Sequence, residues 1–256
     1  MKKLDGKVAI ITGCSKGLGK YIALRYAQEG ARLAICARSF NKLEQTAKLC
    51  EEAGAEVLYK AVDLAQYEEL ESFVQDVITR FGTIDILVNN AVSTQPPHSF
   101  MDHTMEELDS VLSSSFYPTW HLMRLCFPYL KDKSSSIINF GSGVGLRGMD
   151  GYAAYASSKE AIRGLSRVAA REWGQYGIRV NVLCPAAMTD HVKETLPGLD
   201  EKTRAYVIAS LSNGALKRPG DPYEDISPVA VFLASDDSKW ITGKTISADG
   251  GVEIHS

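Results

Sequence analysis

Short apolar runs alternate with longer amphipathic stretches along this chain, and this alternation limits the possible folds more than any other feature of the sequence. The apolar runs predict buried strands, and the amphipathic stretches, several of which stop at a glycine, predict helices. Strands joined by helices form right-handed βαβ units, which put helices on both faces of a parallel sheet. We therefore expect an α/β fold with a parallel sheet between two layers of helices.

The predicted elements follow one another in a regular order. Strands are predicted over residues 7–11, 33–36, 57–62, 84–88, 136–140, 179–183 and 245–248, and helices over residues 20–29, 41–53, 68–81, 152–173, 200–212 and 228–234. No repeat or low-complexity stretch interrupts the sequence, so we expect a single domain over residues 1–256. The connection at residues 189–218 is expected to be a lid that sets substrate choice.

Composition and charge exclude several classes of protein. The formal net charge is −3 and the pI is about 6.0, so no basic surface for nucleic acid is expected. No run of about 18 apolar residues is present that could span a bilayer. The first residues lack the long apolar core of a signal peptide. We therefore expect a cytoplasmic protein with neither a membrane nor a nucleic acid as partner.

The cysteines and histidines give no sign of a disulfide or a metal site. The five cysteines are scattered and form no Cys-x-x-Cys pair, which predicts buried, reduced thiols. The five histidines lack metal-ligand spacing, and His98 and His103, which flank a loop, are expected to be solvated. The sequence therefore predicts no bound metal.

Three glycines, Gly13, Gly17 and Gly19, follow the first predicted strand and open the first helix. A turn without side chains lets a phosphate approach the backbone, and the helix N-terminus offers free N–H groups and a partial positive charge. The spacing, Gly-x-x-x-Gly-x-Gly, differs from the common Gly-x-Gly-x-x-Gly pattern. A plain tight turn is the alternative, but the position between strand and helix favours a dinucleotide site.

Tyr155 and Lys159 are four residues apart in the longest predicted helix, which places them on one face. A free tyrosine has a pKa near 10, and a neighbouring cation favours the phenolate and lowers that value. A tuned Tyr155 could then give a proton to a carbonyl oxygen or take one from an alcohol. Taken alone, the spacing is equally compatible with an ordinary solvated pair, so its interpretation depends on the rest of the chain.

From about residue 7 to residue 251, the chain resembles the short-chain dehydrogenase/reductase family. The resemblance is carried by motifs in the family's order, namely Thr12-Gly13-x-x-x-Gly17-x-Gly19, Asn89-Asn90-Ala91, Ser142, Tyr155-x-x-x-Lys159 and Asp249-Gly250-Gly251. It implies a single Rossmann-type domain with a seven-stranded parallel sheet and a nicotinamide cofactor. It also implies assembly into a homotetramer or homodimer.

The resemblance implies a role for each catalytic residue. Ser142 would hold the substrate oxygen, Tyr155 would be the general acid/base, and Lys159 would tune Tyr155 and bind the nicotinamide ribose. Tyr152 is not expected to be the general acid/base, because the residue four positions later is Ala156 rather than a lysine.

The resemblance also assigns the cofactor-binding residues. Asp63 and Leu64 would meet the adenine and Asn90 the adjacent ribose, whereas Asn89 is expected to brace the sheet. The full set implied to bind the cofactor is Gly13, Ser15, Lys16, Gly17, Leu18, Gly19, Arg38, Asp63, Leu64, Asn90, Ala91, Tyr155, Lys159, Pro185 and Met188.

The end of the second predicted strand bears on which dinucleotide binds. In this fold an acid there holds the ribose hydroxyls of NAD, while an arginine accommodates the additional phosphate of NADP. The sequence has Ala37-Arg38 and no acid, and Lys16 adds a second cation before Gly17. Two ordinary surface bases are the alternative. We predict NADP(H) rather than NAD.

Ser115 stands where the family usually has a catalytic asparagine on the helix after Asn-Asn-Ala. In relatives the main-chain carbonyl at that position holds a water that relays protons to the lysine. Pro118 lacks an N–H and crowds the carbonyl of Ser114, so we expect a distorted helix that frees a carbonyl at Ser114 or Ser115 for the same relay.

Smaller departures lie beside the expected nicotinamide. Val92 replaces a glycine after Asn-Asn-Ala, and Ala186 replaces the glycine of Pro-Gly. The threonine expected five residues after Pro185 is Asp190, with Thr189 one position early. These changes affect the predicted substrate class more than the predicted fold.

These residues favour an NADP(H)-dependent enzyme that interconverts a ketone or aldehyde and an alcohol, with a small carbonyl or alcohol compound as substrate. Reduction of a 3-oxoacyl thioester on an acyl carrier protein is the alternative among enzymes. Lys193, Lys202 and Arg204 could attract such an acidic substrate, or be ordinary surface charges. A non-catalytic redox sensor that binds the cofactor is the alternative from another class, and only Ser115 supports it.

Overall fold

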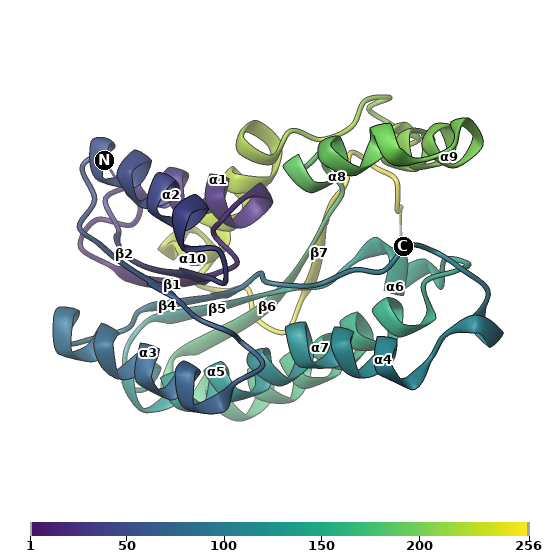
Figure 1. The fold of residues 1–256 in the computed structure, drawn as a ribbon. Helices are drawn as coiled ribbons and strands as arrows, with labels where there is room; N and C mark the ends of the chain where they lie inside the picture. Colours follow the sequence, from purple (N-terminus) through teal and green to yellow (C-terminus); the bar gives the residue numbers. More distant parts are fainter. Residues whose placement is uncertain (1, 255–256) are drawn as a thin grey trace.

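A seven-stranded, all-parallel sheet forms the centre of the protein in a computed structural model that describes residues 2–254 (Figure 1). The strand order is β3-β2-β1-β4-β5-β6-β7. The predicted α/β fold with seven parallel strands is confirmed. The strands are β1 (Val8–Thr12), β2 (Arg32–Ala37), β3 (Val57–Ala61), β4 (Ile86–Asn89), β5 (Ser135–Phe140), β6 (Ile178–Pro185) and β7 (Thr245–Ala248).

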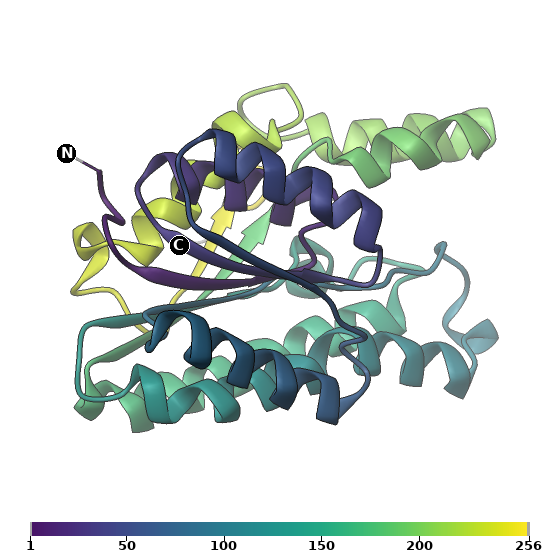
Figure 2. The ribbon, with the colours of Figure 1, turned by 60° about the vertical axis from the view of Figure 1, so that its left-hand side comes forward.

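Helices cover both faces of the sheet (Figure 1, Figure 2). One layer comprises α1 (Gly17–Gln28), α2 (Phe40–Glu52) and α10 (Ser227–Ala234), and the other α3 (Tyr67–Phe81), α5 (Tyr117–Leu130) and α7 (Ala153–Trp173). The shorter helices are α4 (Met105–Val111), α6 (Gly143–Arg147), α8 (Asp190–Thr195) and α9 (Glu201–Ser212). The described residues also form two π-helical turns, Leu112–Phe116 and Pro222–Ile226. They form four 3₁₀ turns, Phe100–Asp102, Gly174–Tyr176, Leu196–Gly198 and Asp236–Ser238.

The apolar residues of each strand divide between two cores. In β1, Ala9 and Ile11 pack into the core under α1, α2 and α10, whereas Val8 and Ile10 pack into the core under α3 and α5. Successive side chains of a strand point to opposite faces, so a strand that is covered on both sides must be apolar throughout. This requirement explains why β1 is a continuous apolar run with every residue buried.

The strand order positions the candidate site. The chain moves outward from β1 to β3 in one direction and from β4 to β7 in the other, so the order reverses between β1 and β4. In open α/β sheets ligands bind at such a reversal, beyond the carboxyl ends of the strands. Helices α6 and α8 follow directly after β5 and β6 at this same edge.

The expectation for the cysteines is met. All five cysteines are buried and free, and burial raises the pKa of each thiol. Among the described residues, none of the helices combines the length and the apolar character needed to cross a bilayer.

Candidate active site

Tyr155 and Lys159 lie on one face of α7, as their spacing predicts. The Nζ atom of Lys159 is 5.7 Å from the centre of the Tyr155 ring. It donates a hydrogen bond of 2.9 Å to the carbonyl oxygen of Phe140, the last residue of β5. Lys159 is 2% exposed, so the end of β5 and the second turn of α7 enclose a cation.

Burial controls the protonation of both side chains. It lowers the pKa of Lys159 to about 8. Burial also raises the pKa of Tyr155, and a hydrogen bond with Ser142 opposes that rise in part. The expected lowering of the Tyr155 pKa by Lys159 is therefore wrong for this structure. Loss of solvation outweighs the other influences on the phenol, and the ammonium of Lys159 is directed to the Phe140 carbonyl.

Ser142 comes to Tyr155 from the sheet. It follows β5 and caps the N-terminus of α6, where its hydroxyl oxygen accepts a hydrogen bond of 3.1 Å from the N–H of Val144. Ser142 is 8% exposed and interacts with the Tyr155 hydroxyl. The strand end and the helix thus bring Ser142, Tyr155 and Lys159 together, whereas Tyr152 remains beside the group with its ring centre 6.5 Å from that of Tyr155.

Ser115 lies in the π-helical turn Leu112–Phe116, directly before α5. The expected distortion near Pro118 is present, because the N–H of Tyr117 reaches back five residues to the carbonyl of Leu112. The Ser115 hydroxyl is 2.5 Å from that of Ser158, the neighbour of Lys159, which joins the turn to α7.

The main-chain carbonyl of Ser115 is not free. It accepts a hydrogen bond of 2.7 Å from the Thr119 hydroxyl. The carbonyl of Ser114 is therefore the better candidate for the relay, since Pro118 has no N–H to give to the carbonyl four residues earlier.

The glycine turn is held by β4. The side-chain amide of Asn90 donates to the carbonyl oxygens of Thr12 and Gly13 at 2.9 and 3.4 Å. A Cβ atom on Gly19 would lie 2.4 Å from the Gly13 oxygen and 2.6 Å from Nδ2 of Asn90. Asn90 therefore braces the turn, and only glycine fits at this close approach. Asn89 donates a hydrogen bond of 2.8 Å to Asn139 of β5, which confirms its expected role in the sheet.

An anion already occupies the N-terminus of α1. The N–H of Gly17 donates a hydrogen bond of 3.0 Å to Oδ2 of Asp190, the first residue of α8. Beside it, Lys16 forms an ion pair with Glu194. The Asp190 carboxylate stands where a phosphate oxygen would accept from the same N–H group, so the turn fits the diphosphate of a dinucleotide.

The other residues implied to bind the cofactor lie around the same edge of the sheet. Arg38 follows β2 and is exposed, and Asp63 and Leu64 follow β3. Pro185 ends β6, and the N–H of Met188 donates to the Gly220 carbonyl at 2.8 Å. Ser15, Leu18 and Ala91 lie in or against the glycine turn.

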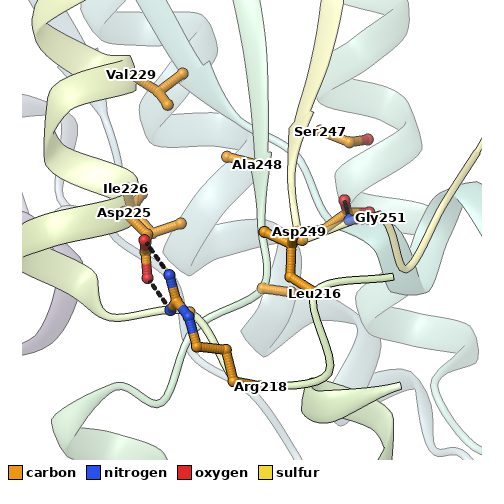
Figure 3. Close-up of a pocket in the computed structure, with 12 residues that line it drawn as sticks. Leu216, Arg218, Asp225, Ile226, Val229, Ser247, Ala248, Asp249 and Gly251 are labelled. Atoms are coloured by element: carbon orange, nitrogen blue, oxygen red, sulfur yellow. Dashed lines mark hydrogen bonds and ion pairs between the residues drawn. The ribbon is translucent and has the colours of Figure 1, made fainter. Parts of the chain in front are cut away.

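A cavity of about 260 Å³ lies between α10, the ends of β6 and β7, and the chain that follows α9. Figure 3 shows the residues that line it. Its lining includes Leu216, Val229 and Asp249, and a bidentate ion pair joins Arg218 to Asp225 at one side. Ser142, Tyr155 and Lys159 do not line it. The cavity is therefore distinct from the group of Ser142, Tyr155 and Lys159.

The Asp249-Gly250-Gly251 motif beside this cavity supports the segment 189–218. The N–H groups of Ala215 and Leu216 donate to the carbonyl oxygens of Gly251 and Gly250 at 3.3 and 2.9 Å. A Cβ atom on Gly251 would lie 2.9 Å from the Ala215 side chain. The motif thus holds one end of the segment by close backbone contact.

Sequence reasoning missed the carboxylates that meet the glycine turn. Asp190 was expected only as a replacement for a threonine, and Glu194 was not considered. The two side chains contact residues that are 173 and 178 positions away in the chain, and no local pattern signals such contacts.

Known proteins resemble this chain over almost its whole length. A family model described as enoyl-(acyl carrier protein) reductase matches residues 13–253. A 12α-hydroxysteroid dehydrogenase from a Clostridium species is 43% identical over 258 residues, which cover 97% of each chain. A 3-oxoacyl-(acyl-carrier-protein) reductase from Thermotoga maritima is 32% identical, over 98% of this chain and 100% of its own. The crystal structure of levodione reductase superposes with a TM-score of 0.91 at 31% identity, over 96% of this chain and 97% of that one.

Proposed function

The chain belongs to the short-chain dehydrogenase/reductase family of oxidoreductases that act on hydroxyl and carbonyl groups, and from that premise we propose that it is an NADP(H)-dependent carbonyl reductase, reversible as an alcohol dehydrogenase. The observation that carries the proposal is the group formed by the buried Ser142 and Lys159 and the half-buried Tyr155, placed at the same edge of the sheet as an anion-binding glycine turn.

A bound nicotinamide would supply or accept the hydride. Tyr155 donates its phenolic proton to the carbonyl oxygen during reduction and recovers it during alcohol oxidation. Its raised pKa keeps the phenol protonated at neutral pH, which suits reduction. Ser142 donates a hydrogen bond to the same oxygen and fixes its position against Tyr155.

Lys159 prepares the group for proton transfer. Its lowered pKa, about 8, lets the ammonium exchange a proton near neutral pH, so it can return a proton to Tyr155 after each reduction. The protons reach Lys159 from the distorted turn at Ser114 and Ser115, which touches α7 through Ser158. In this proposal the backbone of the turn serves where the family's asparagine would.

The preference for NADP(H) rests on charge at the end of β2. Arg38 is exposed there with no acid beside it in Ala37-Arg38-Ser39, and its guanidinium can form a bidentate contact with a phosphate. Lys16 lies within the glycine turn, directly before α1, and adds a second positive charge. Its present partner, Glu194, belongs to the segment 189–218, which we propose as the lid.

The relative with 43% identity, a 12α-hydroxysteroid dehydrogenase, makes a bulky fused-ring ketone or alcohol the first substrate class to test. A 3-oxoacyl thioester on a carrier protein is the second candidate, because the relative from Thermotoga maritima acts on that substrate by its name. A non-catalytic redox sensor would use neither.

A carbonyl panel with NADPH tests the proposal. The panel should contain 12-oxosteroids, a 3-oxoacyl carrier-protein thioester and small ketones, with substrate-dependent loss of NADPH absorbance as the readout. Turnover of at least one ketone is expected. Binding of NADPH by fluorescence with no turnover of any member would favour the sensor instead.

The cofactor preference has its own test. Replacing Arg38 by alanine should weaken NADPH binding by about tenfold or more, since a hydrogen bond between charged groups contributes about 1.5–3 kcal/mol, and should leave NADH binding unchanged. Equal binding of NADH and NADPH by the unaltered protein would contradict the preference.

We also propose a homodimer or homotetramer. Exposed apolar side chains lie on the two long helices of one layer, with Tyr117 and Trp120 on α5 and Val168 on α7. Light scattering of the purified protein measures the mass of the assembly, and a monomer would contradict this part of the proposal.

A further inference from the structure

His98, His103 and Glu107 come together where the loop after β4 meets the start of α4. Nε2 of His98 and Nδ1 of His103 lie 3.0 and 3.3 Å from the same oxygen of Glu107. The expectation that both histidines are solvated is therefore wrong for His103, whose side chain is only 9% exposed. The spacing of these residues in the sequence does not reveal the group, because the ligand atoms come together only in the folded loop.

In each ring the outer nitrogen, the one that points away from Glu107, faces a backbone carbonyl. Nδ1 of His98 is 2.9 Å from the Pro96 oxygen, and Nε2 of His103 is 3.3 Å from the Gly151 oxygen. A carbonyl accepts but cannot donate, so each contact places the proton of a neutral imidazole on that outer nitrogen. In these neutral forms the inner nitrogens, which face Glu107, carry lone pairs, so either a proton or a metal ion can bridge His98 and the Glu107 carboxylate. The buried Nδ1 of His103 makes no hydrogen bond.

Three electron-pair donors that converge in this way can hold a cation between them. In metal sites a histidine ligand commonly donates its other N–H to a backbone carbonyl, which fixes the tautomer and the ring. Ligating carboxylates are in turn held by hydrogen bonds, and Oε2 of Glu107, the oxygen that faces both rings, accepts one of 3.1 Å from the N–H of Thr104. Both features of an outer coordination shell are present.

The distances agree with a small ion of tetrahedral preference. With bonds of about 2.0–2.1 Å, the ligand atoms of a tetrahedral zinc site lie about 3.3 Å apart. The three ligand atoms here all lie within 4.8 Å of one another. The side chains of His98 and Glu107 are each 27% exposed, so an ion can enter from solvent and water can complete the coordination.

We propose that His98, His103 and Glu107 form a binding site for a divalent transition metal, with Zn²⁺ as the best match to two imidazoles and a carboxylate. The bound ion would fasten the loop after β4 to the turn before α7. Gly151 already accepts a hydrogen bond of 3.2 Å from the N–H of His98, and a Cβ atom on it would lie 2.9 Å from Pro97. This turn is four residues before Tyr155, so the metal would set the position of the loop beside the catalytic group.

Calorimetric titration of the full chain, free of any affinity tag, with Zn²⁺ tests the site without recourse to activity. One ion per chain is expected, together with a zinc-dependent rise in melting temperature, because a ligand that binds only the folded state stabilises it. His98→Gln, His103→Gln and Glu107→Gln should each weaken binding by about a hundredfold or more, the upper range for the loss of an outer-shell partner.

Two features keep the test decisive. Glu107→Gln retains the capping box with Thr104, since glutamine serves equally there, so its loss of zinc cannot be attributed to unfolding of α4. His121→Gln, outside the group, is the matched control and should bind zinc like the unaltered protein. Zinc binding that survives in the three variants, or that is absent from the unaltered protein, would overturn the proposal.

Discussion

The two sides of the candidate site are built in opposite ways. Ser142 and Lys159 are buried, and their side chains are hydrogen-bonded to main-chain atoms of α6 and β5, respectively. On the other side, Lys16 and Glu194 pair with side chains that are 35% and 52% exposed. Exposed ion pairs contribute about 1 kcal/mol or less. The side that holds Ser142 and Lys159 is therefore set in advance, whereas the ion pair between Lys16 and Glu194 can be displaced by a ligand at small cost.

Tyr155→Phe is the strongest test of the side that holds Ser142, Tyr155 and Lys159. Removal of the hydroxyl removes the proposed general acid, so turnover should fall by about a thousandfold, within the range for such catalysts. The matched control is Tyr152→Phe, because the two rings are neighbours and only one stands four residues before a lysine. Steady-state rates with NADPH compare them, and an equal loss in both variants would remove Tyr155 from the mechanism.

Lys159→Met should separate activity from stability. Turnover should fall by about a hundredfold. At pH 7 the variant should nevertheless be more stable by about 1–3 kcal/mol. Burial moves the Lys159 pKa from 10.5 to about 8, a cost of about 3 kcal/mol for the folded charge, and loss of the donor to the Phe140 carbonyl offsets part of it.

The stability gain of Lys159→Met should depend on pH. Below about pH 8 the folded protein carries the buried ammonium and its full cost, and between about pH 8 and pH 10.5 the folded lysine is neutral while the unfolded one is still charged. The unaltered protein should therefore approach the variant in stability as the pH rises through that range. Urea unfolding at pH 7 and pH 10 measures the difference, and a variant less stable at pH 7 contradicts the assignment.

Asp190→Asn tests the other side, where the segment 189–218 contacts the glycine turn. The carboxylate competes for the Gly17 N–H that a phosphate would use, and its charge repels that phosphate. The variant should bind NADPH about tenfold more tightly, since a charged hydrogen bond contributes about 1.5–3 kcal/mol. Asp200→Asn is the control, because that carboxylate caps α9 and does not meet the turn. Fluorescence titration measures both, and unchanged affinity in Asp190→Asn would refute the competition.

Ser115→Asn should have the smallest effect. If the backbone of the π-helical turn already serves the relay, the family's asparagine should change turnover by less than about threefold. Pre-steady-state and steady-state rates with the best ketone of the panel measure the change. A rise of about a hundredfold or more would show that the serine impairs the relay.

The sequence predicted the sheet and the shared helix face of Tyr155 and Lys159 well because both follow local rules. The strand predicted over residues 245–248 coincides with β7, and α7 begins one residue after its predicted start. Helix α1, in contrast, begins at Gly17 rather than residue 20, because its glycines were assigned to the turn alone. The spacing of Tyr155 and Lys159 is a property of one helix, so it could be recognised without the fold.

What escaped prediction depends on contacts between distant segments. The course of the segment 189–218 decides that Asp190 meets Gly17, and the sequence showed only a charged residue after a strand. The raised pKa of Tyr155 could not be predicted for a similar reason. Burial is its largest cause, and the burial of a side chain cannot be judged from the spacing of two residues. The same holds for His98 and His103, whose meeting at Glu107 depends on the path of the loop.

The hydrogen bonds by which Asn90 supports the glycine turn have a consequence for the folding of the nascent chain. The residue that secures the glycine turn lies 78 positions after Thr12, so the turn is completed only when β4 has been synthesised and has docked beside β1. A nascent chain that ends before β4 carries every glycine of the motif yet lacks its support. The turn is thus left without this support until the centre of the sheet has assembled.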